Sequence, residues 1–101
     1  MPRGNDMSSH NARILIVEDD ELSRALLESH LLRQGYTVIC AGSGEEALSL
    51  LEKQTVDLVI SDLVMPGMDG IQLMQMAKEQ HPTLPFIVFT AEGSVESAVA
   101  A

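Results

Sequence analysis

Carboxylates follow two separate apolar runs of this sequence, and carboxylates that are brought together can bind a metal ion or attack phosphorus. The run Arg13–Val17 is followed by four acids, which are Glu18, Asp19, Asp20 and Glu21. The mostly apolar run 56–61 is followed by Asp62. Each acid also has an ordinary interpretation, because acids favour the first turn of a helix and Asp is common in turns. Asp62 is therefore either a turn residue or a nucleophile, and the fold decides between them.

The chain alternates short apolar runs, typical of strands covered on both faces, with segments of helical periodicity. The predicted strands are residues 13–17, 36–41, 56–61 and 85–90. The predicted helices are residues 19–35, 43–54, 70–81 and 93–101, the last capped by Ser94. The buried face of the first helix is predicted to contain Leu22, Ala25, Leu26, Ser29 and Leu32, with Leu27 and Leu31 beside it. This order predicts an α/β fold, a parallel sheet with helices on its faces.

The carboxyl ends of parallel strands share one edge of a sheet, where ligands bind. Glu18, Asp19, Asp62 and the hydroxyl of Thr90 all follow predicted strands. Two carboxylates about 4 Å apart repel by about 4 kcal/mol at an effective dielectric near 20, so this edge favours a bound cation. Oxygen ligands with open positions suit Mg²⁺ and phosphate oxygens. A carboxylate there can form an aspartyl phosphate, to which Thr90 could hydrogen-bond.

Two other phosphate chemistries do not fit the sequence. P-loop nucleotide hydrolases need G-x-x-x-x-G-K-[ST], and the Gly-rich stretch 41–46, AGSGEE, has no lysine. Phosphatases of the haloacid dehalogenase type place a second Asp two residues after the nucleophile, and that position here is Val64. No general base or substrate pocket can be named, so the chain is not expected to be an enzyme.

Composition narrows the class of protein further. The 15 acids and 6 bases give a net charge of -9, which disfavours direct binding to nucleic acid or anionic membranes. The single cysteine, Cys40, excludes an internal disulfide and indicates a cytoplasmic protein. No run approaches the about 20 apolar residues of a membrane-spanning helix. Residues 1–12 are polar and are predicted to form a flexible leader, which leaves 13–101 as one domain.

Three stretches together resemble the receiver domain of bacterial two-component response regulators. They are ILIVEDD at 14–20, SDLVMPGMDG at 61–70 and FTA at 89–91, and the resemblance runs from about Arg13 to the last residue. It implies a flavodoxin-like doubly wound sheet with strand order 2-1-3-4-5. The acids after strands one and three would then be neighbours. The final segment also resembles receivers that are joined to ATPase-type transcription activators.

The resemblance implies a role for each matching position. Asp62 matches the phosphoacceptor, and Glu18 and Asp19 match the acidic pair that binds Mg²⁺, with Asp19 the direct ligand. The backbone carbonyl of Val64 matches a further Mg²⁺ ligand, and Thr90 matches the hydroxyl that moves toward the phosphate. Loop and flanking positions match Pro66, Gly67, Gly70, Ala91 and Glu92, while Asp69 is expected to be a cap or turn residue.

The sequence departs from the family after its fourth predicted strand. Family members continue into a fifth β/α unit that carries a phosphate-binding lysine, whereas Lys53 and Lys78 lie in other helices. We therefore expect a truncated receiver with strand order 2-1-3-4, intact metal binding and weak phosphorylation. The fourth strand should have an exposed edge, and such edges favour self-association.

The partners implied are a sensor histidine kinase or phosphotransfer protein, and an output domain in the parent chain. The alternative is a non-phosphorylated pseudo-receiver that acts as a dimerisation or interaction module.

Overall fold

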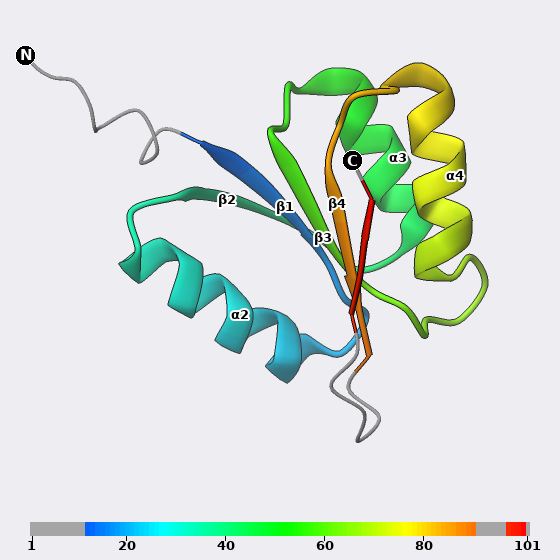
Figure 1. Ribbon diagram of the computed structural model, residues 1–101. Helices are drawn as coiled ribbons and strands as arrows, with labels where there is room; N and C mark the ends of the chain where they lie inside the picture. The colour runs from blue at the N-terminus through cyan, green and yellow to red at the C-terminus, as the bar shows by residue number, and fades with distance from the viewer. Residues whose placement is uncertain (1–11, 91–96, 101) are drawn as a thin grey trace, which may run out of the picture.

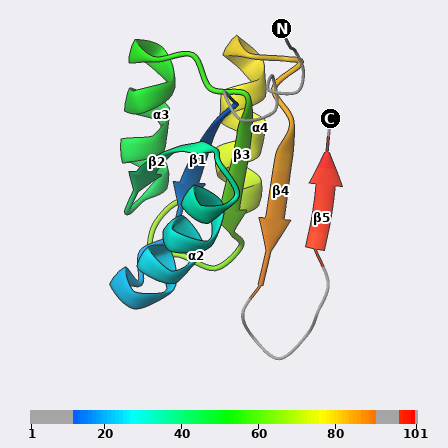
Figure 2. The same cartoon turned by 90° about the vertical axis from the view of Figure 1, so that its left-hand side faces the viewer.

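The computed structural model describes residues 12–90 and 97–100 of the chain. Its elements are β1 (Arg13–Val17), α2 (Glu21–Arg33), β2 (Thr37–Ala41), α3 (Gly44–Lys53), β3 (Leu58–Asp62), α4 (Gly70–Gln80), β4 (Phe86–Phe89) and β5 (Ser97–Ala100). The strands form a single sheet in the order β2-β1-β3-β4-β5, and β1 to β4 are parallel (Figures 1 and 2). The predicted α/β class and the order 2-1-3-4 are therefore confirmed.

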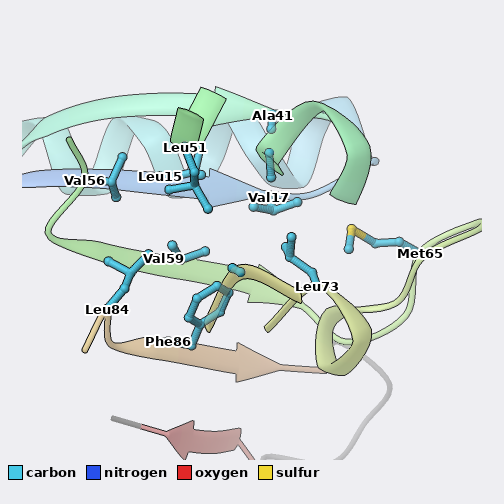
Figure 3. Packing of buried hydrophobic residues seen from close by; sticks show 12 residues of the cluster. Leu15, Val17, Ala41, Leu51, Val56, Val59, Met65, Leu73, Leu84 and Phe86 are labelled. Carbon is cyan, nitrogen blue, oxygen red and sulfur yellow. The ribbon is translucent and has the colours of Figure 1, made fainter. Parts of the chain in front are cut away.

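Helices cover the two faces of the sheet unequally. Figure 1 shows α2 on one face and the pair α3 and α4 on the other. α2 packs against β1 and β2, whereas α3 and α4 pack against each other and together contact β1, β2 and β4. The core lies on the side of α3 and α4, where Leu15, Val59, Leu73 and Phe86 are fully buried (Figure 3). This packing fixes β1 and β3, whose ends carry the acids.

The starts of the helices agree with the sequence-based prediction. Asp20 caps α2 by accepting from the Ser23 N–H, and Ser43 caps α3 by accepting from the Glu46 N–H. Asp69 caps α4, where its side chain and that of Gln72 form a complete capping box. Asp69 is thus a cap, as expected.

The buried face of α2 was predicted wrongly. Leu22, Leu26 and Leu32 are 69%, 64% and 51% exposed. The half-buried residues of this helix are Arg24, Leu27, Glu28 and Leu31, which follow the i, i+3, i+4, i+7 spacing of one helical face. The leucines of α2 fit two different helical faces. The face with Leu27 and Leu31, which also contains Arg24, is the one that packs against β1 and β2.

The last predicted helix is also wrong over its described part. Ser97–Ala100 is strand β5, antiparallel to β4, with Phe86 opposite Ala100 and Phe89 opposite Ser97. Pairing satisfies the N–H and C=O groups at the β4 edge, whereas a helix of nine residues is marginal in water. The β4 edge that was predicted to be open is therefore occupied, and self-association stays a prediction without that support. The predicted cap, Ser94, lies outside the described residues.

Three further observations concern the predicted leader, the single cysteine and membrane-spanning helices. Of the predicted leader only Ala12 is described, and its carbonyl accepts from the Thr37 N–H at 3.0 Å. Cys40 is a half-buried free thiol, and burial raises its pKa. Among the described segments, none of the helices has the length and apolar character needed to cross a bilayer.

Substitution of matched leucines tests this burial pattern. Leu73→Ala should lower the free energy of unfolding by about 2–5 kcal/mol, because it empties a fully buried site. Leu26→Ala should change it by no more than about 0.5 kcal/mol. Urea unfolding followed by circular dichroism measures both values. An equal loss in the two variants would contradict the orientation of α2.

Candidate functional site

The carboxyl ends of β1 and β3 bring three acids together. These strands are neighbours, with Val17 opposite Ser61, so Glu18 follows β1 beside the last residue of β3, Asp62. One carboxylate oxygen from each of Glu18, Asp19 and Asp62 lies within 4.8 Å of the others. The structure thus gathers the three acids that the sequence placed at this edge.

Two of the three acids are buried. Glu18 is 4% and Asp62 is 7% exposed, whereas Asp19 is exposed. Burial raises the pKa of Glu18 above its ordinary value, and the charge of Asp62 and a side-chain hydrogen bond to Asp62 raise it further. A hydrogen bond from the backbone of Asp20 partly opposes this shift. Ionised Glu18 is therefore costly in this structure unless a cation compensates it.

Backbone hydrogen bonds hold Glu18 on both sides. Its N–H donates to the Ala41 carbonyl at the end of β2, at 3.1 Å. Its Oε2 accepts from the Asp20 N–H at 3.0 Å, and Asp20 Oδ2 accepts from the Ser23 N–H at 2.8 Å. The latter bond lowers the pKa of Asp20. The cap of α2 and the orientation of Glu18 thus depend on one short chain of hydrogen bonds.

The loop after β3 closes tightly around Asp62. Asp62 Oδ1 accepts from the Val64 N–H at 3.3 Å, and the Leu63 N–H donates to the Phe89 carbonyl at 2.6 Å. A Cβ on Gly70 would lie 2.5 Å from the Asp62 carbonyl oxygen, so this position requires glycine. Met65 is 7% exposed and anchors the loop in the core. The backbone therefore fixes where the Asp62 carboxylate lies.

The remaining predicted site residues are Thr90, Ala91, Glu92 and Val64. Thr90 is half-buried and directly follows Phe89, the Cα partner of Asp62, so it lies at the same edge of the sheet. Ala91 and Glu92 lie outside the described residues. The role of the Val64 carbonyl as a metal ligand stays a prediction.

The donor set at this edge fits a divalent cation such as Mg²⁺. Three carboxylate oxygens converge, two of them from buried residues, and oxygen is the donor that Mg²⁺ prefers. Burial and the nearby charge of Asp62 both raise the pKa of Glu18, and a bound cation would favour its ionised form. Glu18, Asp19 and Asp62 would hold the ion.

Comparison with known proteins agrees with this fold and this site. The family model "Response regulator receiver domain" matches residues 14–101. The chain therefore belongs to the response regulator receiver domain family.

Individual relatives extend this comparison. The transcriptional regulatory protein GlrR of Escherichia coli strain K12 is 46% identical over 95 residues, which are 94% of this chain and 21% of GlrR. The chemotaxis protein CheY4 of Vibrio cholerae superposes with a TM-score of 0.79 at 32% identity, over 83% of this chain and 72% of CheY4. TrrA of Thermotoga maritima, solved in complex with Mg²⁺ and BeF, gives 0.77 at 35% identity, over 81% and 71%. The chain thus spans about a fifth of the length of GlrR.

Sequence reasoning missed one side chain beside the acids. Arg24 Nη1 donates to the Glu18 carbonyl at 2.8 Å. The only signal was an arginine at the fourth position of α2, on the face that turned out to be half-buried. Its role depends on which face of α2 packs against the sheet, and the periodicity of this leucine-rich helix predicted the wrong face.

The variant Glu18→Gln tests the electrostatics of the site in the metal-free protein. The folded state holds a proton on Glu18 more tightly than the unfolded state does, so raising the pH above the ordinary pKa of 4.5 lowers stability. Glu18→Gln removes this loss. We expect it to melt at a higher temperature than wild type at pH 7, because the glutamine carries no charge to be buried.

Melting in the presence of EDTA between pH 4 and pH 8 provides the measurement. The advantage of the glutamine variant should shrink toward acidic pH, where Glu18 is protonated in both states. A variant that is less stable than wild type at every pH would show that Glu18 is stabilising as a charge, contrary to this account.

Proposed function

We propose that this chain is a phosphoacceptor module of a two-component system, in which Asp62 receives a phosphoryl group from a phosphohistidine. The observation that carries the proposal is the convergence of Glu18, Asp19 and Asp62 at the ends of β1 and β3. Turn or cap roles alone do not require two of these acids to be buried against one another. Asp20, by contrast, has such a role, as the cap of α2.

The transfer is a simple displacement at phosphorus. A carboxylate oxygen of Asp62 forms the new P–O bond, the P–N bond to the donor imidazole breaks, and the imidazole nitrogen regains a proton. The Val64 N–H, which donates to Asp62 Oδ1, and the tight loop that requires Gly70 orient the carboxylate. Thr90, at the end of the adjacent β4, is assigned the hydroxyl contact to the phosphate.

The metal in this proposal is Mg²⁺, held by Glu18, Asp19, Asp62 and the carbonyl of Val64. When bound, it neutralises charge on the transferring phosphoryl group. The relative TrrA, which was solved with Mg²⁺ and BeF, supports this choice of ion. Without a cation, the buried acids oppose the approach of a phosphoryl group that is itself anionic.

The phosphodonor is proposed to be a protein, either a sensor histidine kinase or a phosphotransfer protein. A hollow of about 600 Å³ lies between residues 51–57 and 80–85, at the amino ends of β3 and β4, away from the acids. Two exposed apolar residues instead follow the acids closely in the chain, Leu22 in the first turn of α2 and Val64 two residues after Asp62. Exposed apolar area beside a polar reactive centre suits docking of another protein.

The output in the parent protein is proposed to be transcriptional. The name of GlrR, a transcriptional regulatory protein, states that role, and GlrR matches 94% of this chain. The module itself carries a net charge of -9 and would not bind DNA directly. We further propose a cytoplasmic location.

Phosphorylation of this chain alone is expected to be slow. Its two lysines, Lys53 and Lys78, lie in the last turns of α3 and α4, at the end of the sheet opposite to Asp62. Neither can supply a cation to the transferred phosphate at the acid edge. In this proposal the metal supplies positive charge there.

Incubation with acetyl phosphate and Mg²⁺, followed by intact-mass spectrometry, tests the proposal. Wild type should gain one phosphate, and Asp62→Asn should gain none, because the nucleophilic oxygen is removed. Asp57→Asn is the matched control, since Asp57 is exposed just before β3, at the end opposite to Asp62, and its side chain accepts from the Arg13 N–H. It should be labelled like wild type.

Equal labelling of wild type and Asp62→Asn would overturn the assignment of the nucleophile. A wild-type protein that is neither labelled nor stabilised by Mg²⁺ would favour the alternative, a pseudo-receiver that acts as an interaction module.

A further inference from the structure

We infer that Arg24 is a positioning residue, which holds the β1–α2 connection so that Glu18 and Asp19 face Asp62. This inference rests on the proposed function, because it concerns the same metal site. Arg24 lies in α2, on the half-buried face that contacts the sheet. Its guanidinium carries the charge of an arginine but donates to a neutral backbone carbonyl, that of Glu18, at 2.8 Å.

The bond from Arg24 completes the restraint of Glu18. The Glu18 N–H already donates to the Ala41 carbonyl, and the Glu18 carboxylate accepts from the Asp20 N–H. With Arg24 on its carbonyl, the backbone of Glu18 is held from β2 on one side and from α2 on the other. The peptide unit that Arg24 holds joins Glu18 to Asp19, so its orientation sets the direction of both side chains.

The Arg24 guanidinium also lies close to the turn after β2. A Cβ placed on Gly42 would lie 3.5 Å from Arg24 Nη1 and 3.7 Å from Glu46 Oε1. Glu46 Oε1 accepts from the Gly42 N–H at 2.8 Å, so the turn after β2 is itself ordered. Arg24 therefore lies against this turn while it bonds the Glu18 carbonyl. It thus hydrogen-bonds the residue that follows β1 and lies near the turn between β2 and α3.

Charge and positioning predict opposite effects on metal affinity. If Arg24 acted only through its positive charge, its removal would strengthen Mg²⁺ binding, because like charges repel. If Arg24 positions Glu18 and Asp19, its removal weakens binding, since hydrogen bonds that orient metal ligands are commonly worth 10-fold or more in affinity. The sign of the change therefore distinguishes the two roles.

The test is a calorimetric Mg²⁺ titration of wild type, Arg24→Met, Arg24→Lys and the control Arg33→Met. Arg24→Met keeps the apolar stem and removes the donor, so its Kd for Mg²⁺ should rise about tenfold. Arg24→Lys retains a charged donor and should recover part of the affinity. Arg33 is exposed in the last turn of the same helix, so Arg33→Met loses equal charge and should bind like wild type.

A spectroscopic readout separates positioning from general stability. The NMR carbonyl resonance of Glu18 in the metal-free protein should shift in Arg24→Met and remain in place in Arg33→Met. If Arg24→Met is not folded at 25 °C, Arg24→Gln replaces it, because glutamine is too short to reach the carbonyl.

Unchanged or tighter Mg²⁺ binding in folded Arg24→Met or Arg24→Gln would overturn the inference while leaving the proposed function intact. Absence of Mg²⁺ binding in wild type would instead overturn the metal site on which both depend.

Discussion

The repulsion between two buried carboxylates, Glu18 and Asp62, is the constraint on which the rest of the site depends. The parallel pairing of β1 and β3 forces these side chains to be neighbours. At about 4 Å and an effective dielectric near 20, two such charges cost about 4 kcal/mol. The protein meets this cost partly by raising the pKa of Glu18. An approaching cation removes it, so the same arrangement that strains the metal-free fold creates affinity for metal.

Such a site works only if the acids cannot turn away from one another. The structure prevents this through the backbone: Glu18 is bonded to Ala41 and Arg24, and the loop after Asp62 closes against Phe89 and requires Gly70. These restraints come from α2, β2 and β4, so the site belongs to the whole sheet edge. The free-energy cost of holding the acids close together is thus offset by hydrogen bonds that also stabilise the fold.

The sequence was sufficient where local pattern determines structure. Short apolar runs identified the four parallel strands and, through their shared carboxyl edge, the acids that lie together. The motif around Asp62 then supplied the resemblance that implied the strand order. The sequence was insufficient where a distant partner decides. Leu22 and Leu26, which are exposed, lie on a face of α2 with the same helical spacing as the face that is buried. Only packing against the sheet determines which of the two faces is buried. Likewise Ser97–Ala100 has helical composition, but the open edge of β4 makes it a strand.

The most direct test of this account is the free energy of unfolding of wild type as a function of Mg²⁺ at constant ionic strength. A cation that binds the folded state alone stabilises it by RT ln(1 + [Mg²⁺]/Kd). We predict that stability rises linearly with the logarithm of Mg²⁺ concentration above the Kd. The rise should be lost in the double variant Glu18→Gln, Asp62→Asn. A stability of wild type that does not depend on Mg²⁺, or an equal rise in the double variant, would contradict the central claim that these acids form a cation site.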